Sequence, residues 1–269
     1  MKLGCDTVLF NQLDLYGALQ HIAWAGYDGA EICIHDTWAR HIELNTKQSY
    51  IDEVKSVAKK HGLELLAIDA DVRTQSDEDK IKSMTKVFDV ALKLSIPIVT
   101  TFPYRNSVDE EAIKQDFKYI RELSKRAESR GITLAVKPHI TMSFYNTTTL
   151  IQMLDEINSP ALGVNLDLLQ LFKVGDDLSA AILKIGKRIV HTHFHDCPNR
   201  GQSRETPEEQ IPGRGDIDFP KILGSLKNIG YDKALSVHVV GGLTYPLSRQ
   251  MGIAAEARGY LHRCLQELN

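Results

Sequence analysis

Three histidines alternate along one short segment of the chain, Ile189–His195, which reads IVHTHFH. Residues two apart in an extended strand point to the same face, so His191, His193 and His195 are expected on one face. Burying an imidazole costs free energy unless the ring finds a hydrogen-bond partner. Three histidines also add nothing to the packing of a strand. The alternation therefore favours a functional site in which imidazoles act as bases or as metal ligands.

Further polar residues lie at or just beyond the ends of other apolar runs. They are Glu31, His35, Asp69, Asp71, Thr100, Thr101, Tyr104, Lys137, His139, Asn165, Asp167, Gln170 and His238. Taken singly, a histidine at a strand end is most often structural, a lysine can extend its ammonium to solvent and a glutamine can cap a helix. With Asp167 and His238 on strands beside the histidine row, the combined pattern indicates one site.

Eight short apolar runs would have to position these residues, and a stretch with helical spacing follows each run. The runs are Leu3–Cys5, Gly29–Ile34, Leu63–Asp69, Ile96–Phe102, Ile132–His139, Leu162–Leu166, Ile189–His195 and Ala234–Val240. Several of the helical stretches end in glycine, which accepts the left-handed conformation past a helix end: Gly26, Gly62, Gly131 and Gly230.

Eight such units of about 34 residues match the size of a (β/α)8 barrel. The predicted fold is therefore α/β, a single TIM barrel domain over residues 1–269 with no linker inside it. A doubly wound open sheet is disfavoured because no GxGxxG turn follows the first strand. In such barrels the strand ends and the loops that follow them carry the chemistry.

Composition excludes several classes of protein. The 269 residues are 43% hydrophobic and 25% charged with a formal net charge of −3, which argues against disorder and against a nucleic-acid or membrane surface. No apolar run is long enough for a membrane helix, and the N-terminus does not resemble a secretory signal. Cys5, Cys33, Cys197 and Cys264 form no CxxC pair, so we expect a cytoplasmic protein without disulfides.

Seven segments, in this order and spacing, resemble the sugar isomerase/epimerase superfamily of xylose-isomerase-like TIM barrels. That superfamily includes ketose 3-epimerases, hydroxypyruvate isomerases and inosose dehydratases. The segments are GYDGAEI (26–32), HGLELLAI (61–68), RGITLAVKPH (130–139), LGVNLDLLQ (162–170), HTHFHD (191–196), PGRGDIDF (212–219) and IGYDKALSVH (229–238). The resemblance covers nearly the whole chain.

The resemblance implies a divalent metal held by Glu, Asp, His and Glu on the fifth to eighth strands. Carried over by position, Asp167 and His193 match, whereas Lys137 and His238 occupy the two glutamate positions. Gln170 stands where the family pattern D-x-x-H has a substrate-binding histidine. The cofactor prediction is one zinc, manganese or iron ion on Asp167, His193 and His238, or otherwise none.

Without a metal, Lys137 would take the place of the cation and stabilise an enediolate oxygen. His193 or His238 would then serve as the general base. A desolvated lysine can also form a Schiff base with a ketose, although the resemblance does not imply that chemistry. The catalytic residues predicted on this basis are Lys137, His193 and His238.

The predicted function is isomerisation or epimerisation of a sugar or sugar phosphate by proton abstraction next to a carbonyl. Glu31, His139, Gln170 and Arg200 are the predicted substrate-binding residues, Arg200 being preferred over Arg204 in the polar segment that follows the histidine row. The glycine pair Gly213 and Gly215 resembles a loop that the family places beside the active-site mouth.

Two alternatives stay open, a dehydratase of the inosose-dehydratase kind and a sugar-binding barrel that has lost catalysis. A DNA-repair endonuclease on the same fold is disfavoured by the acidic charge balance. The expected partner is therefore a small sugar-derived molecule and not nucleic acid or a membrane, and the family resemblance suggests a homo-oligomer.

Overall fold

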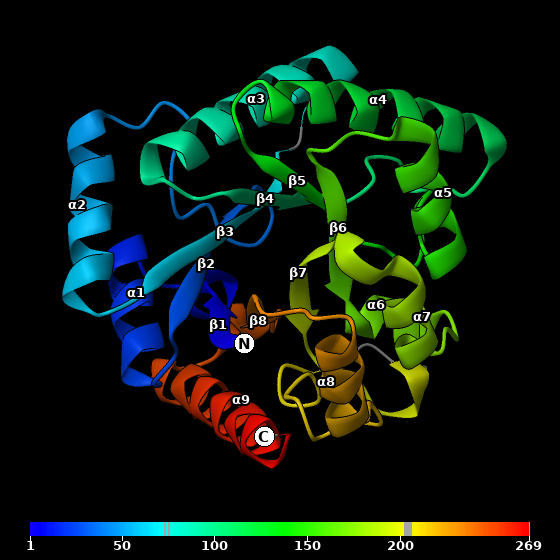
Figure 1. Ribbon diagram of the computed structural model, residues 1–269. Helices are drawn as coiled ribbons and strands as arrows, with labels where there is room; N and C mark the ends of the chain where they lie inside the picture. Colours follow the sequence, from blue (N-terminus) through cyan, green and yellow to red (C-terminus); the bar gives the residue numbers. More distant parts are fainter. Residues whose placement is uncertain (73, 75, 202–205, 269) are drawn as a thin grey trace.

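Eight parallel strands form a closed barrel in chain order, with the first strand paired to the last. The computed structural model describes residues 1–72, 74, 76–201 and 206–268. Figure 1 shows the strands at the centre and the helices as a ring around them. The strands are β1 (Lys2–Asp6), β2 (Gly29–His35), β3 (Glu64–Asp71), β4 (Ile98–Thr101), β5 (Thr133–Val136), β6 (Leu162–Asp167), β7 (Ile189–Phe194) and β8 (Ala234–Val237). The predicted (β/α)8 barrel is confirmed.

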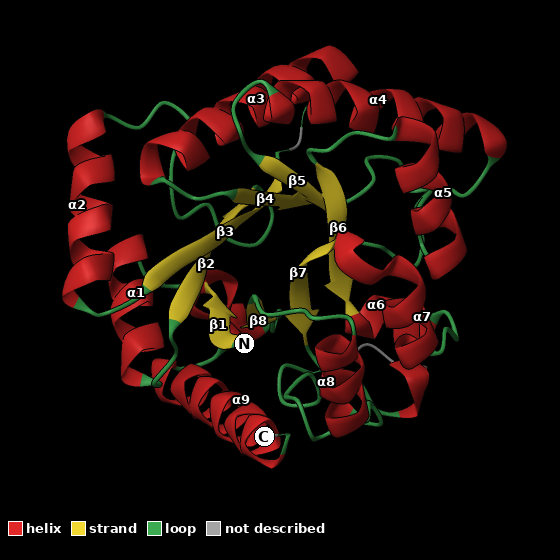
Figure 2. Cartoon of the chain, viewed as in Figure 1, coloured by secondary structure: helices red, strands yellow, loops and turns green. Residues whose placement is uncertain are grey.

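Helices cover the outside of the barrel between successive strands (Figure 2). The α-helices are α1 (Leu15–Trp24), α2 (Gln48–Lys60), α3 (Asp77–Leu94), α4 (Glu110–Glu128), α5 (Thr147–Ile157), α6 (Leu168–Lys173), α7 (Leu178–Ile185), α8 (Phe219–Asn228) and α9 (Leu247–Glu267). Short 3-10 turns are η1 (Thr7–Phe10), η2 (Gly186–Arg188), η3 (Asn199–Gly201) and η4 (Gly242–Thr244). In the described chain, no helix combines the length and the apolar character needed to cross a membrane.

Local sequence explains where many of these helices begin and end. The Asp109 carboxylate accepts a hydrogen bond from the Ala112 N–H at 2.8 Å and so satisfies one of the unpaired donors at the start of α4. Side chains of the same kind cap other helices at Asp14, Ser76, Asn146, Asp167, Asp177 and Asp218. The four glycines expected past helix ends all have positive φ: Gly26, Gly62, Gly131 and Gly230.

Four strands end before the apolar runs that predicted them, namely β4, β5, β7 and β8, and a proline adjoins two of these, β4 and β5. The run Ile96–Phe102 contains a strand only over Ile98–Thr101, and the run Ile132–His139 only over Thr133–Val136. Pro97 precedes the first strand and Pro138 follows the second. Because proline has no N–H to donate, it ends the ladder of strand hydrogen bonds at these positions. Lys137 and His139 therefore lie on the loop after β5.

The hydrophobic core fills the space between the barrel and its helices, whereas the barrel interior near the strand ends is polar. On β7, Phe194 points outward and packs on Phe219 of α8 with ring centroids 5.7 Å apart. The alternate residues His191 and His193 point inward and are 1% and 0% exposed. The strand period of two therefore separates apolar packing from polar chemistry, as the alternation predicted.

Candidate functional site

Strand register brings inward-facing polar residues side by side near the carboxyl ends of the strands. Asp167 on β6 lies next to His193 on β7, and His193 lies next to Ser236 on β8. Asp6 on β1 lies next to Glu31 on β2. All five residues are at most 2% exposed, so their polar groups must find partners inside the barrel.

Glu31 is the centre of the deepest group of polar side chains. Its carboxylate accepts hydrogen bonds from His191 Nε2 at 2.9 Å, His193 Nε2 at 3.2 Å and Ser236 Oγ at 2.6 Å. Burial disfavours the charge on Glu31, but the two imidazoles hold the pKa of this carboxyl well below its ordinary value. Burial also opposes a charge on His193, yet the Glu31 carboxylate raises the pKa of this imidazole to about 10. His193 is therefore an imidazolium at neutral pH.

Asp167 is fixed from three sides. His195 Nε2 lies 2.7 Å from Asp167 Oδ1, His193 Nδ1 lies 3.6 Å from Oδ2, and the Gln170 backbone N–H donates to Oδ1 at the start of α6. Burial works against ionisation here, but His195 and His193 lower the pKa of Asp167 well below its ordinary value. Asp167 is thus an ionised, rigidly held acceptor.

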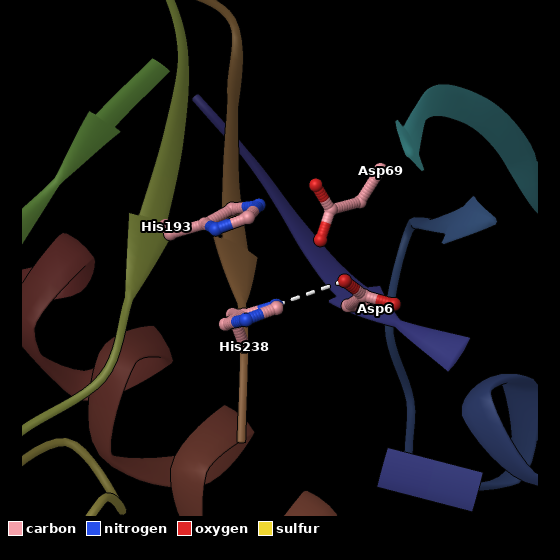
Figure 3. A group of neighbouring side chains, drawn as sticks. All are labelled: Asp6, Asp69, His193 and His238. Atoms are coloured by element: carbon pink, nitrogen blue, oxygen red, sulfur yellow. Dashed lines mark hydrogen bonds and ion pairs between the residues drawn. The ribbon is translucent and has the colours of Figure 1, made fainter. Parts of the chain in front are cut away.

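His238 stacks on His193 and is bonded to Asp6 (Figure 3). The two imidazole centroids are 4.1 Å apart at an interplanar angle of 9°, and His238 Nδ1 lies 2.8 Å from Asp6 Oδ2. Burial, the His193 charge and the Lys137 ammonium all lower the pKa of His238 well below its ordinary value. His238 is therefore a neutral imidazole held beside a cationic one.

Asp6 and Asp69 face the stacked imidazoles from β1 and β3 (Figure 3). Burial raises the pKa of Asp6 well above its ordinary value, and the carboxylates of Glu31 and Asp69 raise it further. Repulsion among carboxylates in a low dielectric is the physical cause of the second effect. Asp6 therefore binds a proton more readily than an exposed carboxyl group, and its side-chain partner is the His238 ring.

Lys137 forms the main cation of the site. Its ammonium lies 3.0 and 3.2 Å from the two oxygens of Asp69, which also accepts from Thr100 Oγ1 at 2.7 Å. Burial alone would lower the pKa of Lys137, but the carboxylates of Asp69 and Asp167 raise it above its ordinary value. The rings of Trp38 and Phe102 lie 5.9 and 5.3 Å from the ammonium. Lys137 is therefore charged, buried and in contact with aromatic faces.

A cavity of about 610 Å³ opens above these residues at the carboxyl ends of the strands. Its walls are formed by His35, Trp38, Asp71, Thr74, Lys80, Phe102, Tyr104, Asn106, Lys137, Pro138, His139, Thr141, Met142, Asp167, Gln170, His195, His238 and Val240. Among them are five of the residues predicted to act in catalysis, substrate binding or metal binding: Lys137, His139, Asp167, Gln170 and His238. Glu31 and His193 are 0% exposed and lie outside this lining.

Gln170 and Arg200, two of the predicted substrate-binding residues, make identifiable local contacts. Gln170 Oε1 accepts from the Ile140 N–H at 3.1 Å, which ties the loop after β5 to α6. Arg200 is exposed, donates to the Phe172 carbonyl at 3.0 Å and stacks on the Phe172 ring, away from the cavity lining. Arg204, its weaker alternative, lies outside the described residues.

The glycine loop between β7 and α8 is anchored on one buried carboxylate. Asp196 accepts hydrogen bonds from the backbone N–H groups of Cys197, Gly213, Gly215 and Ile217, at 2.9 to 3.1 Å. A Cβ atom at Gly215 would lie within 2.5 Å of the Cys197 backbone. Close packing of backbone against backbone therefore requires glycine here, and neither glycine lines the cavity.

Four residues of this region were not predicted from the sequence: Asp6, Trp38, Lys80 and Ser236. Asp6 ends β1 and had the same signal as the other strand-end residues, namely a polar residue after an apolar run. Trp38 lies in the loop after β2, and Lys80 lies in the first turn of α3, where a lysine is usually solvated. Only the folded chain shows that both line the cavity.

The donor sets that approach metal-binding geometry differ from the one expected. Donor atoms of Asp6, Asp69, His193 and His238 lie within 4.8 Å of one another, as do those of Glu31, His191 and His193. Neither group includes Asp167, so the expected combination of Asp167 with His193 and His238 is not brought together in this way by the described residues.

A divalent ion does not fit the residues as they stand. His193 belongs to both groups, and a metal ion on it would have to displace a ring proton that the Glu31 carboxylate stabilises. Asp69 already binds the Lys137 ammonium, and an ion on Asp69 about 4 Å from that charge would be repelled by about 8 kcal/mol at an effective dielectric of 20. The Lys137 ammonium thus already supplies a positive charge at Asp69, where a metal ion would otherwise do so.

Comparisons with known proteins agree with the architecture. A family model described as a xylose isomerase-like TIM barrel matches residues 19–262. An inosose isomerase of Halalkalibacterium halodurans is 25% identical over 262 residues, which cover 92% of this chain and 90% of that protein.

Solved structures show the same fold at lower identity. A D-tagatose 3-epimerase-like protein has a TM-score of 0.78 at 19% identity, covering 100% of this chain and 98% of the other. The probable 3-DHS dehydratase AsbF of Bacillus anthracis has a TM-score of 0.80 at 17% identity, covering 97% and 99%. At these identities the two structures establish a shared fold and leave the activity to be argued from the site.

Proposed function

The chain belongs to the family of xylose isomerase-like TIM barrels, and from that premise we propose that it is a sugar isomerase or epimerase whose ammonium group, on Lys137, does the work of a divalent cation. The observation that carries the proposal is the cavity itself. A charged lysine and a neutral imidazole, Lys137 and His238, line the same space of about 610 Å³. The inosose isomerase relative and the ketose epimerase fold support a polyhydroxylated carbonyl compound as substrate.

In this proposal Lys137 stabilises the negative charge that develops on the substrate carbonyl oxygen. Removing a proton from the neighbouring carbon moves an electron pair toward that oxygen and forms an enediolate. Because Asp69 already holds the ammonium in place, little reorganisation is needed when negative charge develops on the substrate oxygen. A single preorganised donor of this kind contributes on the order of 10²- to 10³-fold in rate.

His238 is the proposed general base. In the form that acts as the base, Asp6 is ionised and accepts from Nδ1, so Nε2 of this cavity-lining ring keeps its lone pair. Proton uptake makes His238 an imidazolium, which Asp6 stabilises at Nδ1. The neighbouring His193 charge opposes this step, and it keeps His238 in the neutral, proton-accepting form beforehand.

Isomerisation and epimerisation need a second group that returns the proton at another carbon or on the other face. The proposed group is His195, which lines the cavity and is held by Asp167 at 2.7 Å. His193 was the other catalytic histidine predicted from the sequence, but with 0% exposure it is assigned here a positioning role under His238. His139 and Gln170 are the proposed contacts for substrate hydroxyls.

Exchange of solvent deuterium tests the proposal. The protein is incubated in deuterated water with D-fructose, D-tagatose, D-allulose and an inosose, and carbon-bound deuterium is followed by NMR and mass spectrometry. Deuterium at the carbon next to the carbonyl, with or without a new sugar, supports the isomerase. Loss of water from the sugar would contradict the isomerase and support the dehydratase. Binding of a sugar without deuterium exchange would support a non-catalytic sugar-binding barrel.

The role of Lys137 as the cation is tested by metal removal. Protein dialysed against a chelator should exchange deuterium at an unchanged rate, and added zinc, manganese or iron should not raise that rate. A loss of more than 10-fold that one of these ions restores would contradict the proposal. Lys137→Glu, which returns the family's carboxylate, serves as the counterpart in metal-binding titrations and should bind divalent ions more tightly than the natural protein.

A further inference from the structure

A second lysine–aspartate pair lies on the cavity wall, and the proposed reaction does not use it. Lys80 Nζ lies 2.9 Å from Asp71 Oδ1, and the two side chains are only 1% and 4% exposed. The same ammonium lies 4.0 Å from the centre of the Tyr104 ring. Both members of the pair and Tyr104 line the cavity above the strands.

Stability does not explain this pair. Taking an ammonium and a carboxylate out of water costs several kcal/mol for each ion, and their attraction often only offsets that cost. Lys80 belongs to the first turn of α3, where an exposed position would have avoided the cost entirely. A pair that is buried from bulk water and faces a cavity is better explained by what enters the cavity.

Strand geometry places this pair on the opposite side of the barrel from His195, the proposed second proton-transfer group. Asp69 and Asp71 are two residues apart on β3, so both point inward, with Asp71 nearer the strand end. Asp69 binds Lys137, and Asp71 binds Lys80. β3 is four strands from β7 in the ring of eight, so the second pair lies across the barrel from His195.

We propose that Asp71 and Lys80 form a subsite that binds neighbouring hydroxyl groups of an uncharged, polyhydroxylated part of the ligand. The carboxylate accepts from one hydroxyl, and the ammonium donates to another. An anionic group such as phosphate is disfavoured here. The Asp71 carboxylate already neutralises the Lys80 ammonium, and this carboxylate would repel a phosphate. The assignment of a remote end to the ligand rests on the proposed function, which puts the reacting carbonyl beside Lys137.

Binding and turnover are measured separately so that the two proposals can be told apart. The main variant is Lys80→Met with Asp71→Asn, which removes both charges of the pair together. Lys82→Met, an exposed lysine on the same helix with 62% side-chain exposure, is the matched control. Binding of D-fructose, D-tagatose, D-allulose and an inosose is measured by saturation-transfer NMR and calorimetry, and deuterium exchange is measured on the same samples.

We expect the double variant to bind the preferred sugar at least 10-fold more weakly than the natural protein, with exchange at saturating sugar reduced less than 3-fold. A deoxy analogue that lacks a hydroxyl of the remote end should bind the natural protein weakly and show no further loss in the variant. The Lys82→Met control should bind as the natural protein does. Phosphorylated forms of the same sugars should bind more weakly than the free sugars.

Each other outcome overturns one proposal or the other. Binding without exchange in the natural protein, lost in the double variant, would keep the subsite and reject the isomerase. Unchanged binding by the double variant would reject the subsite, whatever the exchange shows. Tighter binding of sugar phosphates, or no binding of any of the four sugars to the natural protein, would also reject it.

Discussion

Two cavities of the described chain, one between α2 and the amino ends of β1 to β3 and one at the carboxyl ends of the strands, show by comparison what marks a site. The cavity at the amino ends of the strands is about 680 Å³ and is lined by Lys2, Asp28, Lys55, Lys59 and Glu64 among others. The one at the carboxyl ends is about 610 Å³. The cavity at the amino ends is thus slightly the larger of the two, and the charged side chains named above are exposed.

The environment of the charges separates the two ends. The ion pair of Lys2 with Glu64 has side chains 55% and 53% exposed, so water screens it and it contributes little. The pair of Lys137 with Asp69 has side chains 4% and 0% exposed. In a low dielectric a fixed charge acts strongly on a developing charge nearby. Buried, partnered charge is thus the better mark of chemistry than cavity size.

The largest expected effect comes from removing the buried ammonium. Lys137→Met with Asp69→Asn, which avoids an unpaired carboxylate, should lower the rate of deuterium exchange by about 10³-fold, or about 4 kcal/mol. Lys59→Met at the opposite cavity should leave the rate unchanged. Exchange followed by NMR measures both, with circular dichroism to verify folding. Equal effects of the two changes would erase the distinction between the cavities.

A second test concerns the layer beneath the cavity. Glu31→Gln leaves the His193 charge without its carboxylate, and breaking a buried pair in this way should lower the free energy of unfolding by about 3 kcal/mol. Urea unfolding measures the loss. A loss in the free energy of unfolding below about 1 kcal/mol would show that water screens the His193–Glu31 pair as much as the exposed Lys2–Glu64 pair.

Glu31→Gln should also change the titration of His193, which would not happen if Glu31 served only in packing. The pKa of His193 is raised to about 10, so its charge stabilises the fold fully below pH 6.5, and this contribution disappears as the pH rises through 10. Ring nitrogen shifts of His193 should therefore stay constant from pH 6 to 9 in the natural protein. In Glu31→Gln they should titrate at lower pH, and an unshifted titration would contradict the pairing.

Loss of the proposed base should have a smaller effect on the reaction. His238→Gln should lower kcat by about 100-fold with little change in KM, because the change removes proton transfer and leaves the lysine and the binding contacts in place. Steady-state kinetics on the sugar that shows exchange measures both constants. A change confined to KM would make His238 a binding residue.

The smallest effect is expected at the amino end. Lys2→Met and Glu64→Gln, alone or together, should leave the midpoint of urea unfolding and the exchange rate unchanged within error, because the pair is solvated. Raising the salt concentration should likewise change nothing measurable. A clear loss of exchange in either variant would mean that the amino-end cavity takes part in function.

Much of the fold was predictable from local pattern. The eight apolar runs predicted all eight strands, because a β-strand in a barrel is short, apolar and bounded by turn residues. The prediction failed only at strand ends such as those near Pro97 and Pro138, where backbone hydrogen bonding stops before apolar character does. The alternation of His191, His193 and His195 correctly predicted one inward face.

The candidate site was predictable in part. Strand-end position identified Lys137, Asp167 and His238, since parallel strands of a barrel bring their carboxyl ends together. The family resemblance, and not strand-end position, predicted Arg200, which stacks on Phe172 and is not among the residues that line the cavity. Neither signal revealed Lys80, whose position in a helical turn is ordinary for a solvated lysine.

The sequence by itself determined which side chains face inward and at which end of the barrel they gather, because both follow from periods of two and 3.6 residues along the chain. Only the tertiary structure decided which charges meet. Lys137 pairs with Asp69 over a separation of 68 residues, and His238 pairs with Asp6 over 232. Protonation depends on those partners and on burial, and neither is encoded in any local stretch of residues.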